Sequence, residues 1–182
     1  MKKISTRDLV IIPLFSILIA VCSWLSIPAA VAFTMQTFAV YLTLLILGGK
    51  KGMISVTIYI LLGAVGIPVF SNMTGGVGIL LGVTGGYILG FLLMCPVYGI
   101  AQRLFGKKIM VSIIALVIGL LVCYAFGTAW FMHAYAKGTG PIGIGTALSW
   151  CVIPFIIPDL GKLLLALIIY SRLKPFIKSF TN

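Results

Sequence analysis

The chain has 182 residues, of which 62% are hydrophobic and only 8% are charged. A water-soluble domain carries about 25% charged residues, so this composition excludes an ordinary soluble protein. The excess of 13 Lys and Arg over two acids would suit nucleic acid in a soluble domain, but the basic residues form short clusters between apolar runs. We therefore expect an all-α integral membrane protein, with one membrane domain over residues 1–182 and no nucleic-acid partner.

Six apolar runs of helical length follow one another along the chain, and each predicts a transmembrane helix. The first run is longer than the roughly 7–15 residues of a signal-peptide core, so we expect a retained helix. The second and third runs are short for a hydrocarbon core of about 30 Å. The expected helices cover residues 9–27, 35–47, 53–66, 84–102, 109–131 and 149–171.

Basic clusters precede the first run, separate runs two and three and runs four and five, and follow the last run. With six helices, these clusters all lie on one side of the membrane, and the opposite connections hold only Lys137. Cytoplasmic loops carry the excess of Lys and Arg. The pattern predicts a multi-pass protein of the cell membrane with both termini in the cytoplasm.

Two outer connections are rich in glycine. Residues 66–87 are too apolar for an ordinary wet loop, and irregular backbone at membrane depth needs cover from protein or a cavity. We expect this segment to fold back over the bundle as a lid or pocket wall. The connection at residues 133–148 is either a gate or a plain connector.

Asp159 is the most informative residue, because it is the only acid after Asp8 and lies inside the last apolar run. Counting back from Arg172 at about 1.5 Å per residue places Asp159 roughly 20 Å and Lys162 roughly 15 Å from the basic boundary. A charge at that depth costs at least about 2.5–3.5 kcal/mol, so it needs a partner. Residues three apart share one helix face, so Asp159 and Lys162 should pair or converge on one ligand.

The Asp159–Lys162 pair fits two interpretations, a ligand site or an ion pair that only fixes packing. As a site, it would accept and donate hydrogen bonds, which suits a neutral group with both N–H and C=O, such as a ureido ring. Aromatic residues could wall an apolar ring system, and Tyr87 and Trp130 are our substrate-binding candidates among them. The full aromatic set is Tyr87, Tyr124, Phe126, Trp130, Phe131, Trp150 and Phe155.

Four further residues are candidate contacts. Gln36 begins the second run and Asn72 lies in the Gly-rich connection, so each is either a pocket contact or a helix-capping or loop-packing residue. Ser16 and Ala20 are small residues four apart in the first run. That spacing lets another helix approach closely, which would suit docking to a partner subunit.

Motifs of nucleotide hydrolysis and metal catalysis are missing from the sequence. No G-x-x-x-x-G-K-[ST] or H-E-x-x-H motif occurs, and the four cysteines show no C-x-x-C spacing. The single His133 has no acid near it in sequence. An enzyme is poorly supported, and we expect no catalytic residue, metal or cofactor in this chain.

Several segments resemble the BioY family, the substrate-binding S-components of biotin transporters. The similar stretches are residues 34–52, 63–70, 75–76, 84–87 and 157–162, in the expected order along most of the chain. The family's usual Gly-Pro-Thr-Gly-Gly-Tyr reads Gly-Val-Thr-Gly-Gly-Tyr over residues 82–87.

The resemblance implies an energy-coupling factor (ECF) transporter. In that family the S-component binds biotin from outside, and a transmembrane coupling subunit with two cytoplasmic ATPases supplies the work from ATP. Ser16 and Ala20 would correspond to the family's Ala-x-x-x-Ala contact with the coupling subunit.

The resemblance also implies residue roles in this chain. Asp159 and Lys162 would hold the ureido ring of biotin, with Thr84 and Tyr87 at the same site. The loop over residues 70–84 would close over the ligand. Three alternatives stay open: an S-component for another vitamin, a stand-alone facilitator or channel, and a structural subunit that binds no small molecule.

Overall fold

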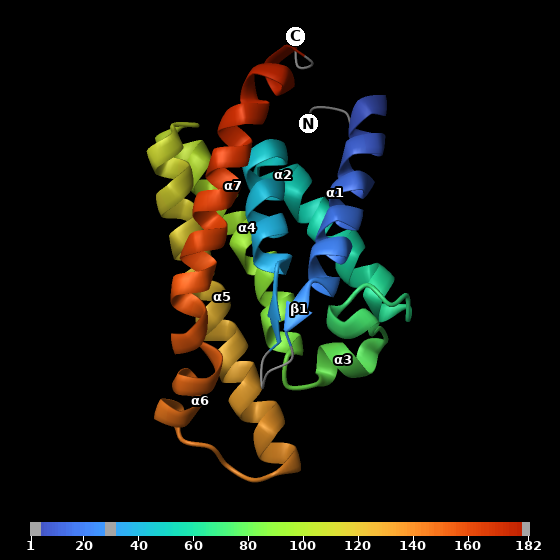
Figure 1. The fold of residues 1–182 in the computed structure, drawn as a ribbon, viewed down its shortest axis with the longest axis vertical. Coiled ribbons are helices and arrows are strands. Elements are labelled where there is room, and N and C mark those ends of the chain that lie inside the picture. The colour runs from blue at the N-terminus through green and yellow to red at the C-terminus, as the bar shows by residue number, and fades with distance from the viewer. Residues whose placement is uncertain (1–4, 28–31, 180–182) are drawn as a thin grey trace.

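The computed structural model describes residues 5–27 and 32–179, which are mostly helical (Figure 1). One two-stranded hairpin is the only sheet in this part of the chain. In chain order the elements are α1 (Thr6–Trp24), β1 (Ser26–Ile27), β2 (Phe33–Thr34), α2 (Gln36–Ala64), η1 (Ser71–Met73), α3 (Val77–Leu81), α4 (Gly85–Phe105), α5 (Ile109–Gly138), α6 (Ile144–Cys151) and α7 (Ile153–Ser179).

Helix α2 is bent at Gly48, where φ is 76° and ψ is 174°. Glycine adopts a positive φ without the steric cost of a Cβ, so the chain turns here and the helix resumes. The expected helices at residues 35–47 and 53–66 are therefore the two arms of one bent element (Figure 1). Within residues 5–27 and 32–179, five helices are long and apolar enough to cross a membrane. The expected count of six is not confirmed.

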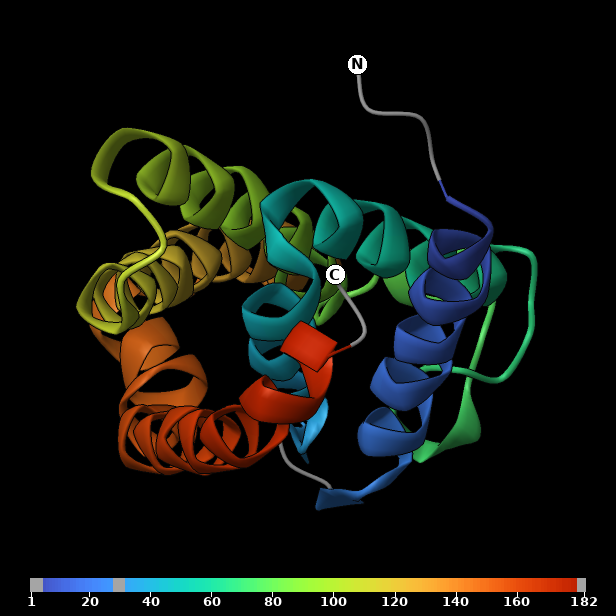
Figure 2. The same cartoon turned by 90° about the horizontal axis from the view of Figure 1, so that it is seen from above.

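Helix α2 lies at the centre of the bundle, where it packs against α1, α4 and α7 (Figure 2). Helix α5 runs along α4, and α6 contacts both α5 and α7. The backbones of α2 and α4 come very close at Gly49, because a Cβ there would overlap the Cα of Gly99. Small residues permit such close helix crossings in membrane proteins.

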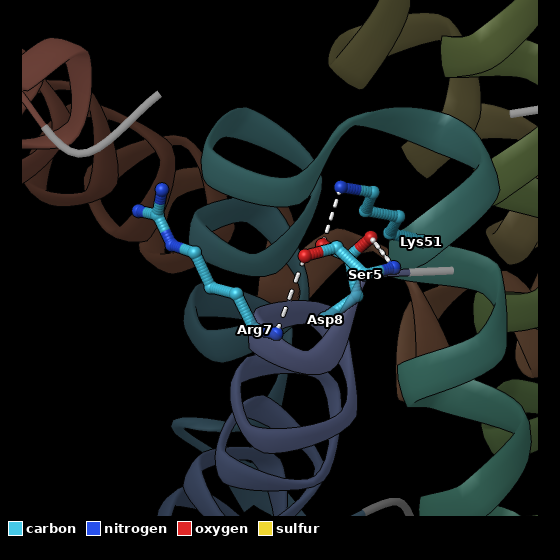
Figure 3. Close-up of polar contacts among 4 residues, drawn as sticks. All are labelled: Ser5, Arg7, Asp8 and Lys51. Atoms are coloured by element: carbon cyan, nitrogen blue, oxygen red, sulfur yellow. Dashed lines mark hydrogen bonds and ion pairs between the residues drawn. The ribbon is translucent and has the colours of Figure 1, made fainter. Parts of the chain in front are cut away.

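The start of α1, the bend of α2 and the end of α7 lie at the same end of the bundle (Figure 1). Lys51, beside the bend, donates to the carboxylate of Asp8 in α1 at 2.5 Å. Asp8 also accepts from the backbone N–H of Ser5, whose side chain accepts from the N–H of Arg7 (Figure 3). This capping box fixes the start of α1. We call this end of the bundle the basic end; its cytoplasmic location stays a prediction.

The connection between α2 and α4 is packed against the bundle. Phe70 is fully buried, and its ring meets the ring of Tyr59 edge-on at a centroid distance of 5.6 Å. The hydroxyl of Ser23 in α1 donates to the carbonyl of Val69 at 2.5 Å. These contacts tie the connection to α1 and to the second arm of α2. Its role as an outer lid stays a prediction.

The connection between α5 and α6 is shorter than the expected loop at residues 133–148. Helix α5 continues to Gly138 and α6 begins at Ile144. The correction has a local cause, since residues 133–137 contain no helix breaker, whereas Gly140 (φ 106°) and Pro141 follow the end of α5. The expected last helix likewise starts later, at Ile153, after a break at Val152.

Candidate ligand-binding site

Asp159 and Lys162 form a buried ion pair in α7. The Nζ of Lys162 donates to Oδ1 of Asp159 at 2.8 Å, and the two residues are 5% and 3% exposed. Their spacing places both side chains on one helix face, while Ile157 and Leu160 are exposed on the other. The pairing predicted from the spacing is confirmed.

Two residues from distant parts of the chain hold this pair. The hydroxyl of Tyr124 in α5 donates to Oδ2 of Asp159 at 2.6 Å, a short charge-assisted hydrogen bond. The Nζ of Lys162 lies 4.1 Å from the ring centroid of Phe33 in β2. A cation desolvated over an aromatic face gains about 2 kcal/mol. Phe33 also stacks with Phe155 of α7 at 6.1 Å, so the hairpin forms one wall of the site.

The pair retains capacity for a ligand. Each oxygen of Asp159 accepts one of the hydrogen bonds described above, whereas a carboxylate has about four lone-pair sites. Lys162 has three donors, one of which reaches Asp159. A buried ion pair contributes little net stability, because desolvation offsets the Coulomb attraction. The arrangement is therefore suited to receive a group that both donates N–H and accepts through C=O.

A cavity of about 70 Å³ lies beside the pair, with residues of the hairpin, α2, η1, α4, α5, α6 and α7 around it. Small-molecule sites usually enclose about 300–1,000 Å³. The space beside the pair is therefore small for a ligand of vitamin size. Ser71 of η1 and Thr84, just before α4, lie on the wall formed by the connection between α2 and α4.

The structure brings five of the predicted substrate-binding residues to this cavity, namely Gln36, Thr84, Tyr87, Asp159 and Lys162. The amide Nε2 of Gln36 donates to the hydroxyl of Tyr59 at 2.8 Å, which orients its carbonyl. The hydroxyl of Tyr87 is 2.9 Å from that of Thr128. The contact of these five predicted residues with a ligand stays a prediction.

Asn72 and Trp130, the other two predicted substrate-binding residues, do not line the cavity, and their contact with a ligand stays a prediction. Asn72 is exposed, has a φ of 57°, and accepts from the hydroxyl of Ser26 at 3.0 Å. Asparagine tolerates this left-handed conformation, which explains its presence in the turn. The indole of Trp130 donates to the carbonyl of Gly82 at 3.0 Å. Both residues therefore hold the connection between α2 and α4 in place.

Three of the seven aromatic candidates line the cavity: Tyr87, Tyr124 and Phe155. Phe126 and Trp150 are 36% and 43% exposed. Both can face lipid, the usual environment of an exposed aromatic residue on a membrane helix.

Ser16 and Ala20 face the interior of the chain, with exposures of 1% and 5%. The hydroxyl of Ser16 donates to the backbone carbonyl of Ser55 in α2 at 2.8 Å. The close helix approach that small residues permit is thus made between α1 and α2. Their face is covered by α2 in this structure, and their role in docking a partner stays a prediction.

Sequence reasoning missed several cavity residues. Sequence reasoning also missed Phe33, which lies over Lys162 beside the cavity; it belongs to a two-residue strand, which is too short to show any periodicity. Phe91 and Cys123 lie in apolar runs, where nothing in the residue type separates a cavity-facing side from a lipid-facing one. Thr34 and Thr37 flank Gln36, and that polar cluster at a helix start is the signal that could have found them.

Comparison with known proteins decides the family. The profile described as the BioY family matches residues 1–179. The chain belongs to the BioY family. The biotin transporter BioY of Thermotoga maritima is 40% identical over 170 residues, which cover 92% of this chain and 96% of that protein. The probable biotin transporter BioY of Pyrococcus horikoshii is 37% identical over 169 residues, with the same shares. The biotin transporter BioY2 of Lactococcus lactis is 31% identical, and 100% of each chain is covered.

A solved structure shares the fold of this BioY-family chain. It is the 2.1 Å crystal structure of the S-component for biotin from an ECF-type ABC transporter, with a TM-score of 0.80 and 24% identity. The match covers 93% of this chain and 91% of that one. The family expected from the sequence is confirmed, and the chain is a multi-pass membrane protein with the fold of an S-component.

Proposed function

We propose that this BioY-family protein captures biotin as the S-component of an energy-coupling factor transporter. The observation that carries the proposal is the buried Asp159–Lys162 pair beside a cavity walled by Tyr124 and Phe155. The ureido ring of biotin carries two N–H donors and one carbonyl acceptor. The carboxylate can accept from the N–H groups while the ammonium donates to the carbonyl. The names of the relatives support the same ligand.

The remaining cavity residues would hold the rest of the molecule. The aromatic residues pack against the fused rings, and Gln36 and Thr84 supply polar contacts. Because the cavity holds only about 70 Å³, binding requires a displacement of one wall. We assign this movement to the connection between α2 and α4, because that wall consists of short elements.

Energy for transport comes, in this proposal, from partner subunits. The sequence contains no P-loop motif, so we assign ATP hydrolysis to two cytoplasmic ATPase subunits. A transmembrane coupling subunit would link these ATPases to this chain. The basic end would lie on the cytoplasmic side of the cell membrane, in agreement with the positive-inside rule. Biotin would then enter the cavity from the outer side.

Binding of biotin to the purified protein in detergent tests the first half of the proposal. We expect a dissociation constant in the nanomolar range, about −12 kcal/mol, and no comparable binding of riboflavin or thiamine. Tight binding of another vitamin in place of biotin would move the protein to a different substrate. Binding of none of the three would contradict the capture role.

Uptake of labelled biotin tests the second half. Cells that express the protein with a complete coupling subunit and ATPase module should accumulate biotin, and inactivation of the ATPases should abolish accumulation. Concentrative uptake that survives this inactivation would contradict the proposed dependence on partner ATPases. Passive equilibration without partners would favour a stand-alone facilitator.

A further inference from the structure

A second cavity lies between α4 and α5, and it shares no lining residue with the cavity beside Asp159 and Lys162. Its volume is about 330 Å³, and apolar side chains line it. The lining residues are Val97, Ala101, Phe105, Val111, Ile114, Ala115 and Ile118. We call this cavity the α4–α5 groove.

The groove has a buried floor and an open outer side. Ala115 on the floor is 1% exposed, while Phe105, Ile114 and Ile118 are 69%, 54% and 47% exposed. In a bilayer, these exposed side chains meet acyl chains, because the hydrocarbon core contains little water. A groove of this kind cannot stay empty there, so a chain of matching shape will fill it.

Polar contacts hold α4 and α5 at a fixed spacing next to the groove. The hydroxyl of Tyr98 donates to Ser112 at 3.2 Å and accepts from the Nε2 of Gln102 at 2.8 Å. Tyr98 and Ser112 are 1% and 5% exposed, so these bonds lie on the inner side of the helix pair. The groove is therefore preformed, and helix closure would strain these bonds.

The length of the groove matches one leaflet of a bilayer. Ile118 follows Lys108 by ten residues, a rise of roughly 15 Å along α5. Half of a hydrocarbon core of about 30 Å has the same depth. Beyond the groove the two helices come into contact, with Gly119 against Met94. An acyl chain that enters from the basic end would thus end where the leaflet ends.

Two lysines lie at the mouth of the groove, Lys107 and Lys108, which stand between the groove residues Phe105 and Val111 in the chain. Arg103 is two residues from both Ala101 and Phe105, so it projects from the other side of α4. Both lysines are exposed and lie in the connection from α4 to α5, at the basic end (Figure 1).

The sequence holds two acids, Asp8 and Asp159, and these pair with other lysines. The two lysines at the mouth therefore have no carboxylate side chain as a counter-ion. Basic sites between membrane helices attract anionic lipid head groups.

We propose that the α4–α5 groove binds an anionic phospholipid of the leaflet at the basic end. One acyl chain lies in the groove, and the phosphate head group lies against Lys107 and Lys108. A phospholipid fits because the apolar groove ends at these two cations, as an acyl chain ends at its head group. This surface shares no residue with the ligand cavity, so its occupation does not depend on biotin binding.

Native mass spectrometry of the delipidated protein tests the proposal, with titration by dioleoyl phosphatidylglycerol or dioleoyl phosphatidylcholine. We expect the phosphatidylglycerol to bind at least tenfold more tightly. The variant Lys107→Gln/Lys108→Gln should lose about fivefold in affinity for each cation removed. The control Lys50→Gln/Lys174→Gln removes equal charge from exposed sites at the same end and should keep the preference.

Ala101→Leu, which fills the groove from α4, should reduce the number of bound lipids of either head group. Thermal unfolding in detergent checks that each variant is folded. Equal binding of the two lipids by the wild type, or equal losses in both double variants, would overturn the proposal. It would also fail if Ala101→Leu left lipid binding intact but weakened assembly with the coupling subunit, since the groove would then be a protein contact.

Discussion

The Asp159 carboxylate is held from two sides by groups that lie far apart in sequence. Lys162 contacts one oxygen and Tyr124 the other, at 2.8 and 2.6 Å. These bonds fix the carboxylate plane before a ligand arrives, and preorganised groups bind with a smaller entropic cost. The hydroxyl of Tyr124 is therefore a positioning group for the proposed biotin site.

The variant Tyr124→Phe should weaken biotin binding by about tenfold or more while the protein stays folded. A hydrogen bond to a charged group contributes about 1.5–3 kcal/mol, and its loss frees the carboxylate to rotate. Isothermal titration calorimetry measures the effect. Tyr98→Phe removes another buried hydroxyl, one bonded to Ser112, and should leave the affinity unchanged. Wild-type affinity in Tyr124→Phe would show that its hydroxyl does not position the site.

Substitution of two other fully buried tyrosines by phenylalanine should have opposite effects on stability. The hydroxyl of Tyr41 is the only buried side-chain polar atom of the described residues without a hydrogen-bond partner, whereas that of Tyr59 accepts from Gln36. An unpaired buried hydroxyl costs free energy, so Tyr41→Phe should keep or raise the unfolding temperature. Tyr59→Phe should lower the unfolding temperature, because the amide of Gln36 loses its acceptor and the free energy of unfolding falls by about 1–3 kcal/mol. Equal destabilisation by the two substitutions in a thermal unfolding assay would contradict this distinction.

At the scale of the elements, the crossing of α2 and α4 fixes the bundle. The bend at Gly48 turns α2 toward α4, and Gly49 then lies against the backbone of Gly99. The first arm of α2 carries Gln36 and Thr37 to the cavity, and the same crossing places α4 with Tyr87 opposite them. A shift of this crossing would therefore change the cavity as well as the packing.

The two glycines of the crossing should respond differently to alanine. A Cβ at Gly49 would overlap backbone atoms of α4, whereas a Cβ at Gly99 would lie 3.5 Å from the Cα of Gly49, an ordinary contact. Gly49→Ala should lower the unfolding temperature, since overpacking costs about 1–3 kcal/mol. Gly99→Ala should be tolerated, because alanine also favours a helix. Thermal unfolding of both variants checks this order, and a reversed order would show that the crossing is looser than described.

The sequence anticipates the local features of these elements well. The spacing of Asp159 and Lys162 lies within one helix turn, so the pair follows from helix geometry alone. The contacts of Tyr124, Phe33 and Ser16 depend on which helices become neighbours. Hydrophobic periodicity cannot decide that choice when nearly every face of a helix is apolar. For the same reason, the break at Gly48 could be read as a gap between two helices.

At the scale of the whole molecule, charge decides how the bundle sits in the membrane. The start of α1, the bend of α2 and the end of α7 share one end of the bundle (Figure 1). In the sequence, the basic clusters fall at these three places and at the connection between α4 and α5. Lys137, in the last turn of α5, lies near the opposite end of the long α5 helix from Lys108. The predicted orientation follows from this asymmetry.

Cysteine labelling in intact cells tests the orientation. A membrane-impermeant maleimide should label Lys137→Cys from outside and should label Lys50→Cys only after the membrane is opened. Both lysines are exposed, whereas the four native cysteines are at most 7% exposed and should give little background. Labelling of Lys50→Cys in intact cells would place the basic end outside.

The measurement that bears most directly on the central claim is biotin affinity in variants of the two acid–lysine pairs. Asp159→Asn and Lys162→Met should each weaken binding by at least about 100-fold, because each leaves a buried charge without its partner. The double variant Asp159→Asn/Lys162→Met leaves no unpaired charge, so it should stay folded and still fail to bind. Asp8→Asn, at the exposed pair with Lys51, should bind as the wild type does. Wild-type affinity in Asp159→Asn, or an equal loss in Asp8→Asn, would contradict the assignment of the buried pair as the biotin site.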